Sequence, residues 1–235
     1  MSVGEKLATI AENEQKVYDA GKNFQYHEFW DNLQQYGQRK EYIGTFSRWN
    51  KTLFKPKYDM QPTKAMYMFE NFRTDIDMVE LLKECDVTLD FSKCTNFQNF
   101  LMWSHILRLG VIDTRSAAQV HFYYAYMLKT IDRLILKDDG SQTFSFESCP
   151  IQNITIEGVI GKNINLKWSS KITHDSLISI INALSTTATK QTVTFSKTAI
   201  NNAFGIDIDD ETTYPEGSEF YNLRNTKSNW NFSYV

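Results

Sequence analysis

The feature that most constrains the fold of this chain is a degenerate internal repeat. Three short apolar segments can be overlaid so that Ile106, Leu128 and Ile151 take the same place, with separations of 22 and 23 residues. Each segment is followed by a second strand-like stretch. One such unit is too small to bury its own apolar face, so we expect the units to stack as successive coils around one continuous core.

The C-terminal part of the chain predicts an αβ cap on this stack. Thr173 is a favourable N-cap, and an apolar stripe at helical spacing follows it. A strand is predicted at 192–195. A less regular second unit follows, with a short helix capped by Ser196, a helix near 220–223 and a closing strand at 230–234.

Residues 1–40 predict a helical attachment segment, and residues 41–64 an ordered linker that precedes the repeats of 65–235. The linker is expected because helical and strand periodicity are both lost there and two prolines favour extended backbone. The first helix has an apolar stripe that is short for an isolated coiled coil, so self-association and docking on its own domain both stay open. The stripe consists of Val3, Leu7, Ile10 and Val17.

Composition narrows the class of protein. With 42% hydrophobic, 14% aromatic and 23% charged residues, the chain is predicted to fold rather than to be disordered. A net charge of -3 provides no excess of positive charge for nucleic acid. We find no apolar signal segment at the start and no long apolar window, so we expect synthesis in the cytoplasm and no membrane insertion.

The residues that could support catalysis or metal binding lack the required spacing. The four histidines, His27, His105, His121 and His174, show no metal-ligand pattern, and the acidic run at 207–211 lacks the glycine and glutamate of a calcium loop. The cysteines Cys85, Cys94 and Cys149 form no C-x-x-C pair and are expected to be reduced. A cysteine nucleophile, Cys94 or Cys149 with His105 or His121 as base, is the weaker alternative to simple packing. We therefore predict no enzyme activity, no metal and no cofactor.

One aromatic cluster is the candidate binding surface. It consists of Phe122, Tyr123, Tyr124 and Tyr126. Exposed aromatic rings suit sugar rings and protein hot spots alike, and packing in the core or between coils is the alternative.

Several phrases of the chain resemble known bacterial repeats. Residues 91–97 and 146–156 resemble the Phe-x-x-Cys-x-x-Leu-x-x-Ile-x-Ile unit of BspA-type leucine-rich repeats. Other phrases are similar to a repeat family found in phages and prophages of gut Firmicutes, at 129–140, 156–161 and 180–185 and, near the start, at 3–7, 13–21 and 54–59. Between residues 72 and 125 the chain departs from the pattern.

The resemblance implies an α/β fold: a leucine-rich-repeat-like solenoid with irregular coils and a C-terminal αβ cap, preceded by N-terminal helices. It also implies a non-enzymatic structural and binding protein of a phage or prophage tail, located in the virion. Its partners would be other tail or virion proteins, further copies of itself, or a host-surface protein or glycan. The alternatives are a bacterial surface adhesin of the same repeat type and, more remotely, a cell-wall polysaccharide hydrolase, which would need a cleft with two carboxylates.

Overall fold

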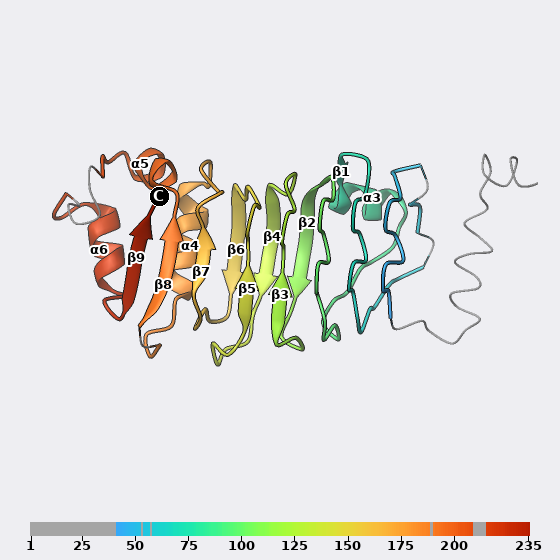
Figure 1. Cartoon of the computed structure of the whole chain (residues 1–235), viewed down its shortest axis with the longest axis horizontal. Helices are drawn as coiled ribbons and strands as arrows, with labels where there is room; N and C mark the ends of the chain where they lie inside the picture. The colour runs from blue at the N-terminus through green and yellow to red at the C-terminus, as the bar shows by residue number, and fades with distance from the viewer. Residues whose placement is uncertain (1–40, 53, 57, 189, 209–214) are drawn as a thin grey trace, which may run out of the picture.

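The computed structural model describes residues 41–52, 54–56, 58–188, 190–208 and 215–235. In this part the chain winds in successive coils along the long axis of the molecule, with β9 near one end and the first described coil near the other (Figure 1). The predicted N-terminal helices, with Val3, Leu7, Ile10 and Val17, lie outside the described residues. Within them, no helix combines the length and the apolar character needed to cross a bilayer.

One side of the stack is a four-stranded parallel sheet in the order β1-β2-β4-β6. In its register Arg108 pairs with Thr130, and Thr130 pairs with Asn153. These pairings reproduce the predicted separations of 22 and 23 residues, because each coil places the same apolar positions against the shared core. The strands are β1 (Ile76–Asp77), β2 (Ile106–Asp113), β4 (Thr130–Ile135) and β6 (Asn153–Glu157).

A second set of parallel strands forms another side of the coils. Its members pair as β3-β5 and as β7-β8-β9. Toward the N-terminal end, isolated parallel bridges extend the β3-β5 pair: Phe97 bridges Val120 of β3, and Asn96 bridges Lys64 in the preceding coil. The β3-β5 pair was not predicted from the sequence. The strands are β3 (Gln119–His121), β5 (Thr143–Ser145), β7 (Ile164–Leu166), β8 (Gln191–Phe195) and β9 (Trp230–Tyr234).

The expected linker at 41–64 is wrong, because this segment forms a coil of the same stack. Glu41 bridges Lys64 in parallel, and the Tyr42 N–H donates to the Lys64 carbonyl at 2.8 Å. Phe46 and Phe54 are fully buried and pack edge to face at 4.7 Å. Burial of these large rings draws the segment into the core, although it has no strand or helix period to show this in the sequence.

Four helices are described: α3 (Met78–Glu84), α4 (His174–Ala183), α5 (Lys197–Phe204) and α6 (Glu219–Asn225). Thr173 and Ser196 are confirmed at the N-cap positions of α4 and α5, although neither side chain accepts a capping hydrogen bond from its helix. The predicted strands at 192–195 and 230–234 are confirmed as β8 and β9. Helix α4 packs beside β6, at the place where another strand of the first sheet would lie. It lies behind β7 and β8 in the view of Figure 1.

The core changes in character along the stack. Toward the N-terminal end it is mainly phenylalanine, where Phe46 stacks on Phe69 at 5.4 Å and Phe69 meets Phe100 at 5.7 Å. Toward the C-terminal end aliphatic residues such as Ile154 and Ile181 take over. All of these residues belong to one continuous cluster, so the coils share a single interior.

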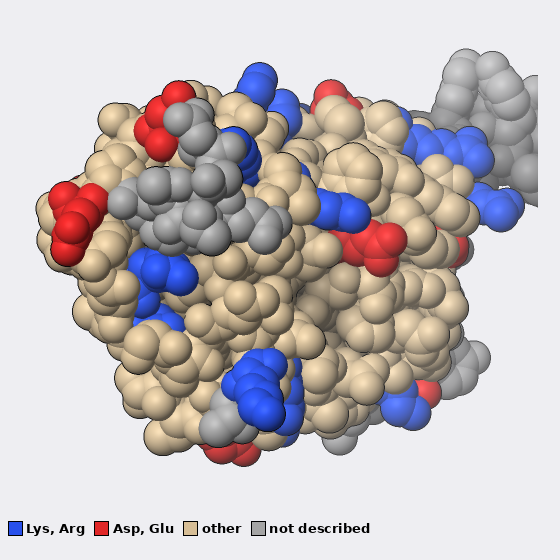
Figure 2. Space-filling view, turned by 60° about the vertical axis from the view of Figure 1, so that its left-hand side comes forward, with Lys and Arg blue, Asp and Glu red and all other residues tan. Residues whose placement is uncertain are grey.

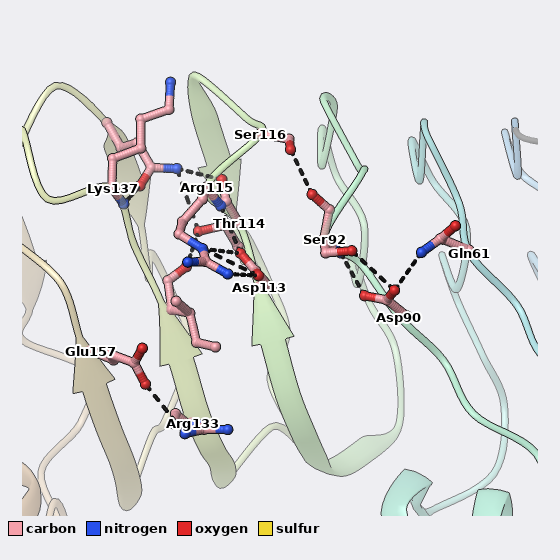
Figure 3. Close-up of polar contacts among 12 residues, drawn as sticks. Gln61, Asp90, Ser92, Asp113, Thr114, Arg115, Ser116, Arg133, Lys137 and Glu157 are labelled. Carbon is pink, nitrogen blue, oxygen red and sulfur yellow. Dashed lines mark hydrogen bonds and ion pairs between the residues drawn. The ribbon is translucent and has the colours of Figure 1, made fainter.

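Polar side chains tie the corners of neighbouring coils at the carboxyl ends of β2, β4 and β6 (Figure 3). Asp90 and Asp113 each accept the backbone N–H two residues ahead, which is the Asx geometry of a tight turn. Gln142 is fully buried: its Nε2 donates to the Thr114 and Ala117 carbonyls at 2.7 and 3.0 Å, and its Oε1 accepts from the N–H of Lys137 at 2.6 Å. These bonds fix the path between coils.

Candidate functional site

The strands of the second set present an uncharged surface to solvent. Along them every second side chain points into the core, as Val120, Phe144 and Val193 do, so the residues on either side point outward. In the register of the strands Gln119 lies beside Thr143, and His121 beside Ser145. We call the outward positions the uncharged face: Asn96, Gln98, Gln119, His121, Thr143, Ser145, Asn163, Asn165, Thr192, Thr194, Asn231 and Ser233.

Two depressions lie on the uncharged face. The amide depression, of about 310 Å³, is lined by Thr95, Asn96, Gln98, Ala118, Gln119 and His121. The hydroxyl depression, of about 320 Å³, is lined by Phe144, Ser145, Asn163, Ile164, Asn165, Thr192 and Thr194. Neither is lined by a carboxylate or a basic side chain, so both offer hydrogen bonds without formal charge. In the view of Figure 2 the charged side chains form small separate groups, with extensive uncharged surface between them.

Several amides of the uncharged face are held in place by the backbone. The Oδ1 atom of Asn96 accepts the Gln98 N–H at 2.9 Å, and that of Asn163 accepts the Thr192 N–H at 2.7 Å. Asn165 accepts the N–H of Lys167 at 3.1 Å. Because these bonds restrain the side chains before any ligand arrives, less conformational entropy would be lost on binding.

His121 joins the amide depression to a group of aromatic side chains. Its ring lies 4.6 Å from that of Tyr123, which is 6.4 Å from Tyr124, which in turn is 5.9 Å from Tyr126. Partial burial lowers the pKa of His121 below its usual value, so the imidazole is neutral at pH 7. It therefore offers one hydrogen-bond donor and one acceptor rather than a positive charge.

Three of the four predicted aromatic binding residues reach the surface, and one does not. Phe122 is fully buried and stacks on Phe146 of the next coil at 5.1 Å, so its assignment to a binding surface is wrong. Tyr123 and Tyr124 are half-buried, and Tyr126 is 50% exposed. Phe122 turns inward because it lies two residues after the inward-pointing Val120, in keeping with the alternation of the strand.

Sequence analysis missed Trp103, which lies beside these tyrosines. The backbone N–H of Trp103 donates to the Tyr124 carbonyl at 3.0 Å, and Trp103 is 47% exposed. We call Trp103, Tyr123, Tyr124 and Tyr126 the aromatic corner. No regular spacing in the sequence links Trp103 to the tyrosines, because the coil between them belongs to the part of the chain where the repeat departs from its pattern.

The backbone of the aromatic corner is left-handed at two positions. Trp103 and Tyr124 have left-handed φ values of 58° and 53°. The corresponding corner of neighbouring coils is also left-handed, and there Arg48, Asn71 and Ser148 occupy it. Small polar residues adopt this conformation more readily than large aromatic ones, and strained positions are concentrated at functional sites. The choice of Trp and Tyr is therefore not explained by the turn itself.

The outer face of the first sheet has a different character. Arg108 forms a two-pronged ion pair with Asp132 at 2.8 and 2.9 Å and also reaches Asp77 at 3.4 Å. Arg133 pairs with Glu157 at 3.3 Å (Figure 3). The charges of this face neutralise one another across strands, which leaves the uncharged face and the aromatic corner as the distinctive surface.

The cysteines and histidines do not assemble a reactive group in the described residues. Burial raises the pKa of Cys94 to about 11 and raises that of the fully buried Cys149 further, so both thiols are protonated at neutral pH. His105 pairs with Asp75 at 2.8 Å. Among the residues that the structure describes, no three His, Cys, Asp or Glu side chains are grouped to hold a metal ion. Most of the acidic run at 207–211 lies outside the described part.

Neither a family model nor a curated protein nor a solved structure matches this chain. Because a fold by itself does not determine function, the function must be argued from the geometry and chemistry of the site.

Proposed function

We propose that this chain is a non-enzymatic structural and binding protein of a phage or prophage tail. Its stacked coils would form a leucine-rich-repeat-like solenoid whose surface engages a host-surface receptor or another tail protein. The assignment to a phage tail and virion rests on the sequence resemblance. The assignment as a binding protein rests on the surface described above.

The observation that carries the binding proposal is the aromatic corner. Large exposed rings are costly in water, and Trp103 and Tyr124 also occupy left-handed corners that a small residue would fill with less strain. Tyrosine and tryptophan dominate the energetics of binding surfaces because they combine a large apolar area with a polar group. A partner that covers these rings would offset both costs.

Binding without hydrolysis is favoured by the lining of the two depressions. Hydrolysis of a glycosidic bond usually needs two carboxylates across the scissile bond, and neither depression is lined by Asp or Glu. The side chains that do line them can donate and accept hydrogen bonds without carrying a formal charge.

Adsorption of the purified full chain to a panel of gut Firmicutes cells, with pull-down of tail proteins in parallel, tests this function. The informative variant is Trp103→Asn/Tyr124→Asn, because asparagine accepts a left-handed φ. It should fold at least as stably as the parent and lose most of the binding. Arg133→Ala, on the opposite sheet, is the matched control. Unchanged binding by the double variant, or release of sugars from the cell wall by the parent protein, would contradict the proposal.

A further inference from the structure

The uncharged face continues well beyond the aromatic corner. It runs from Asn96 and Gln98 across β3 and β5, and continues across β7, β8 and β9, where β5 contacts β7 without pairing with it. Within each sheet the parallel register sets the outward side chains in two rows. A partner for the aromatic corner alone would not need such a surface. The length of the uncharged face indicates an extended ligand.

We infer that the uncharged face binds one neutral polysaccharide chain laid across the coils, with the amide and hydroxyl depressions as two subsites. The inference rests on the proposed binding function and names its ligand class. The aromatic corner, joined to the amide depression through His121, would stack against a sugar ring at one end of the chain.

Charge is the first argument for this ligand. None of the twelve outward residues is Asp, Glu, Lys or Arg, whereas the outer face of the first sheet carries Arg108, Asp132, Arg133 and Glu157. Anionic glycans and nucleic acids are recognised through Lys and Arg, which the uncharged face lacks. The face therefore complements a ligand without formal charge.

Hydrogen bonding is the second argument. A neutral sugar presents hydroxyl groups that both donate and accept, and the amides of Gln98, Gln119 and Asn165 and the hydroxyls of Thr192 and Thr194 do the same. Protein hot spots, by contrast, usually place a large apolar anchor in a buried pocket. The two depressions are lined mainly by small polar side chains, which favours a sugar over a peptide.

Spacing is the third argument. Paired strands lie about 4.8 Å apart. Because β5 contacts β7 without pairing with it, the two depressions, which are two to three strands apart, are separated by at least about 12 Å. A polysaccharide that spans both depressions would gain affinity, because once one subsite is occupied the second binds a part of the same molecule. Oligosaccharides too short to reach both would bind more weakly.

Affinity electrophoresis of the full chain in gels containing soluble neutral glucan, mannan or galactan tests the inference, with polygalacturonate as the anionic counterpart. We expect retardation by at least one neutral polysaccharide, no retardation by polygalacturonate, and little effect of added NaCl. Gln119→Glu and Thr194→Glu place a carboxylate in one depression each and should each weaken retardation about tenfold. Thr155→Glu, exposed on β6 in the first sheet, is the matched control, and thermal unfolding checks that each variant folds.

Varying the length of the oligosaccharide distinguishes a surface with two subsites from a surface with one. A neutral decasaccharide should bind more tightly than a trisaccharide of the same sugar, and Thr194→Glu should abolish that difference. Absence of binding to every neutral polysaccharide, equal effects of Thr194→Glu and Thr155→Glu, or retardation that falls steeply with salt would overturn the inference. If cells are still bound through a protease-sensitive receptor, the inference fails while the proposed binding function stands.

Discussion

The hydroxyl oxygen of Ser176, in helix α4, accepts a hydrogen bond of 2.9 Å from the backbone N–H of Ile154, in strand β6. Three residues along the same helix, Ser179 accepts the N–H of Ile156 at 2.8 Å. The helix thus satisfies, through two side chains, the strand donors that another parallel strand would otherwise satisfy.

Removal of the Ser176 hydroxyl should destabilise the fold. Ser176→Ala leaves the buried N–H of Ile154 without its acceptor, and we expect the free energy of unfolding to fall by about 1–3 kcal/mol. Urea denaturation measures the change. Ser170→Ala, at an exposed position before the helix, should be nearly neutral, and an equal effect of both substitutions would show that the strand donor is not the cause.

The buried amide of Gln142 should be still more sensitive. Gln142→Ala removes the hydrogen bonds of this amide and takes from the Ala117 carbonyl and the Lys137 N–H the partner that Gln142 provides, whereas the Thr114 carbonyl keeps its bond from the Ala117 N–H at 2.8 Å. We expect a loss of about 3 kcal/mol in the free energy of unfolding. Gln119→Ala, which removes the same amide from the surface, should cost much less. Hydrogen exchange at the Lys137 amide gives a second readout, and unchanged protection there would contradict the role assigned to Gln142.

Gly161 is required by a close approach of two corners. A Cβ atom at this position would collide with the backbone carbonyl of Gly140 in the preceding coil. Because backbone cannot move aside as a flexible side chain can, Gly161→Ala should lower the free energy of unfolding by about 1–3 kcal/mol. The neighbouring exposed substitution Lys162→Ala should have little effect in the same thermal unfolding series, and a stable Gly161→Ala protein would refute the predicted clash.

His174 should titrate above its usual range. Its Nε2 lies 3.0 Å from a Glu219 oxygen and its Nδ1 3.2 Å from Asp175, and these hydrogen bonds, that to Glu219 first, raise the pKa of the imidazole. Because the folded pKa lies above the unfolded value of about 6.5, the stability that these hydrogen bonds contribute to the fold is fully present below about pH 6.5. It is lost as the pH rises through the folded pKa.

Histidine ring resonances followed by NMR from pH 5 to 9 test this assignment. Glu219→Gln should move the pKa of His174 back toward its ordinary value. The pKa of His121, which is lowered by burial, should stay below it in both proteins. A titration of His174 that is insensitive to Glu219→Gln would contradict the proposed pair.

Much of the stack could be predicted because its signals are local. The separations of 22 and 23 residues gave the register of β2, β4 and β6, and capping residues gave the starts of α4 and α5. The β3-β5 pair was missed because strands of three residues alternate for too short a distance to be distinguished from a loop. The coil at 41–64 was missed because turns and bridges, rather than periodic strands, hold it.

The candidate site could be predicted only in part. The tyrosines were singled out by composition, but which aromatic residue turns inward depends on the register of Val120 against Phe144. Knowledge of that register would have placed Phe122 in the core, and it would have placed Gln119 beside Thr143 and His121 beside Ser145 on the surface. Trp103 is brought to Tyr124 by tertiary structure alone. The leucine-rich-repeat-like solenoid and the phage-tail role remain predictions.

The placement of α4 beside β6 also bears on how this chain behaves at high concentration. An uncovered parallel strand is a template on which the same strand of another molecule can add, and long stacks of coils are prone to grow in this way. A helix whose serine hydroxyls already occupy the strand donors offers no such template. At β6 the first sheet is therefore protected against the addition of a strand from another molecule.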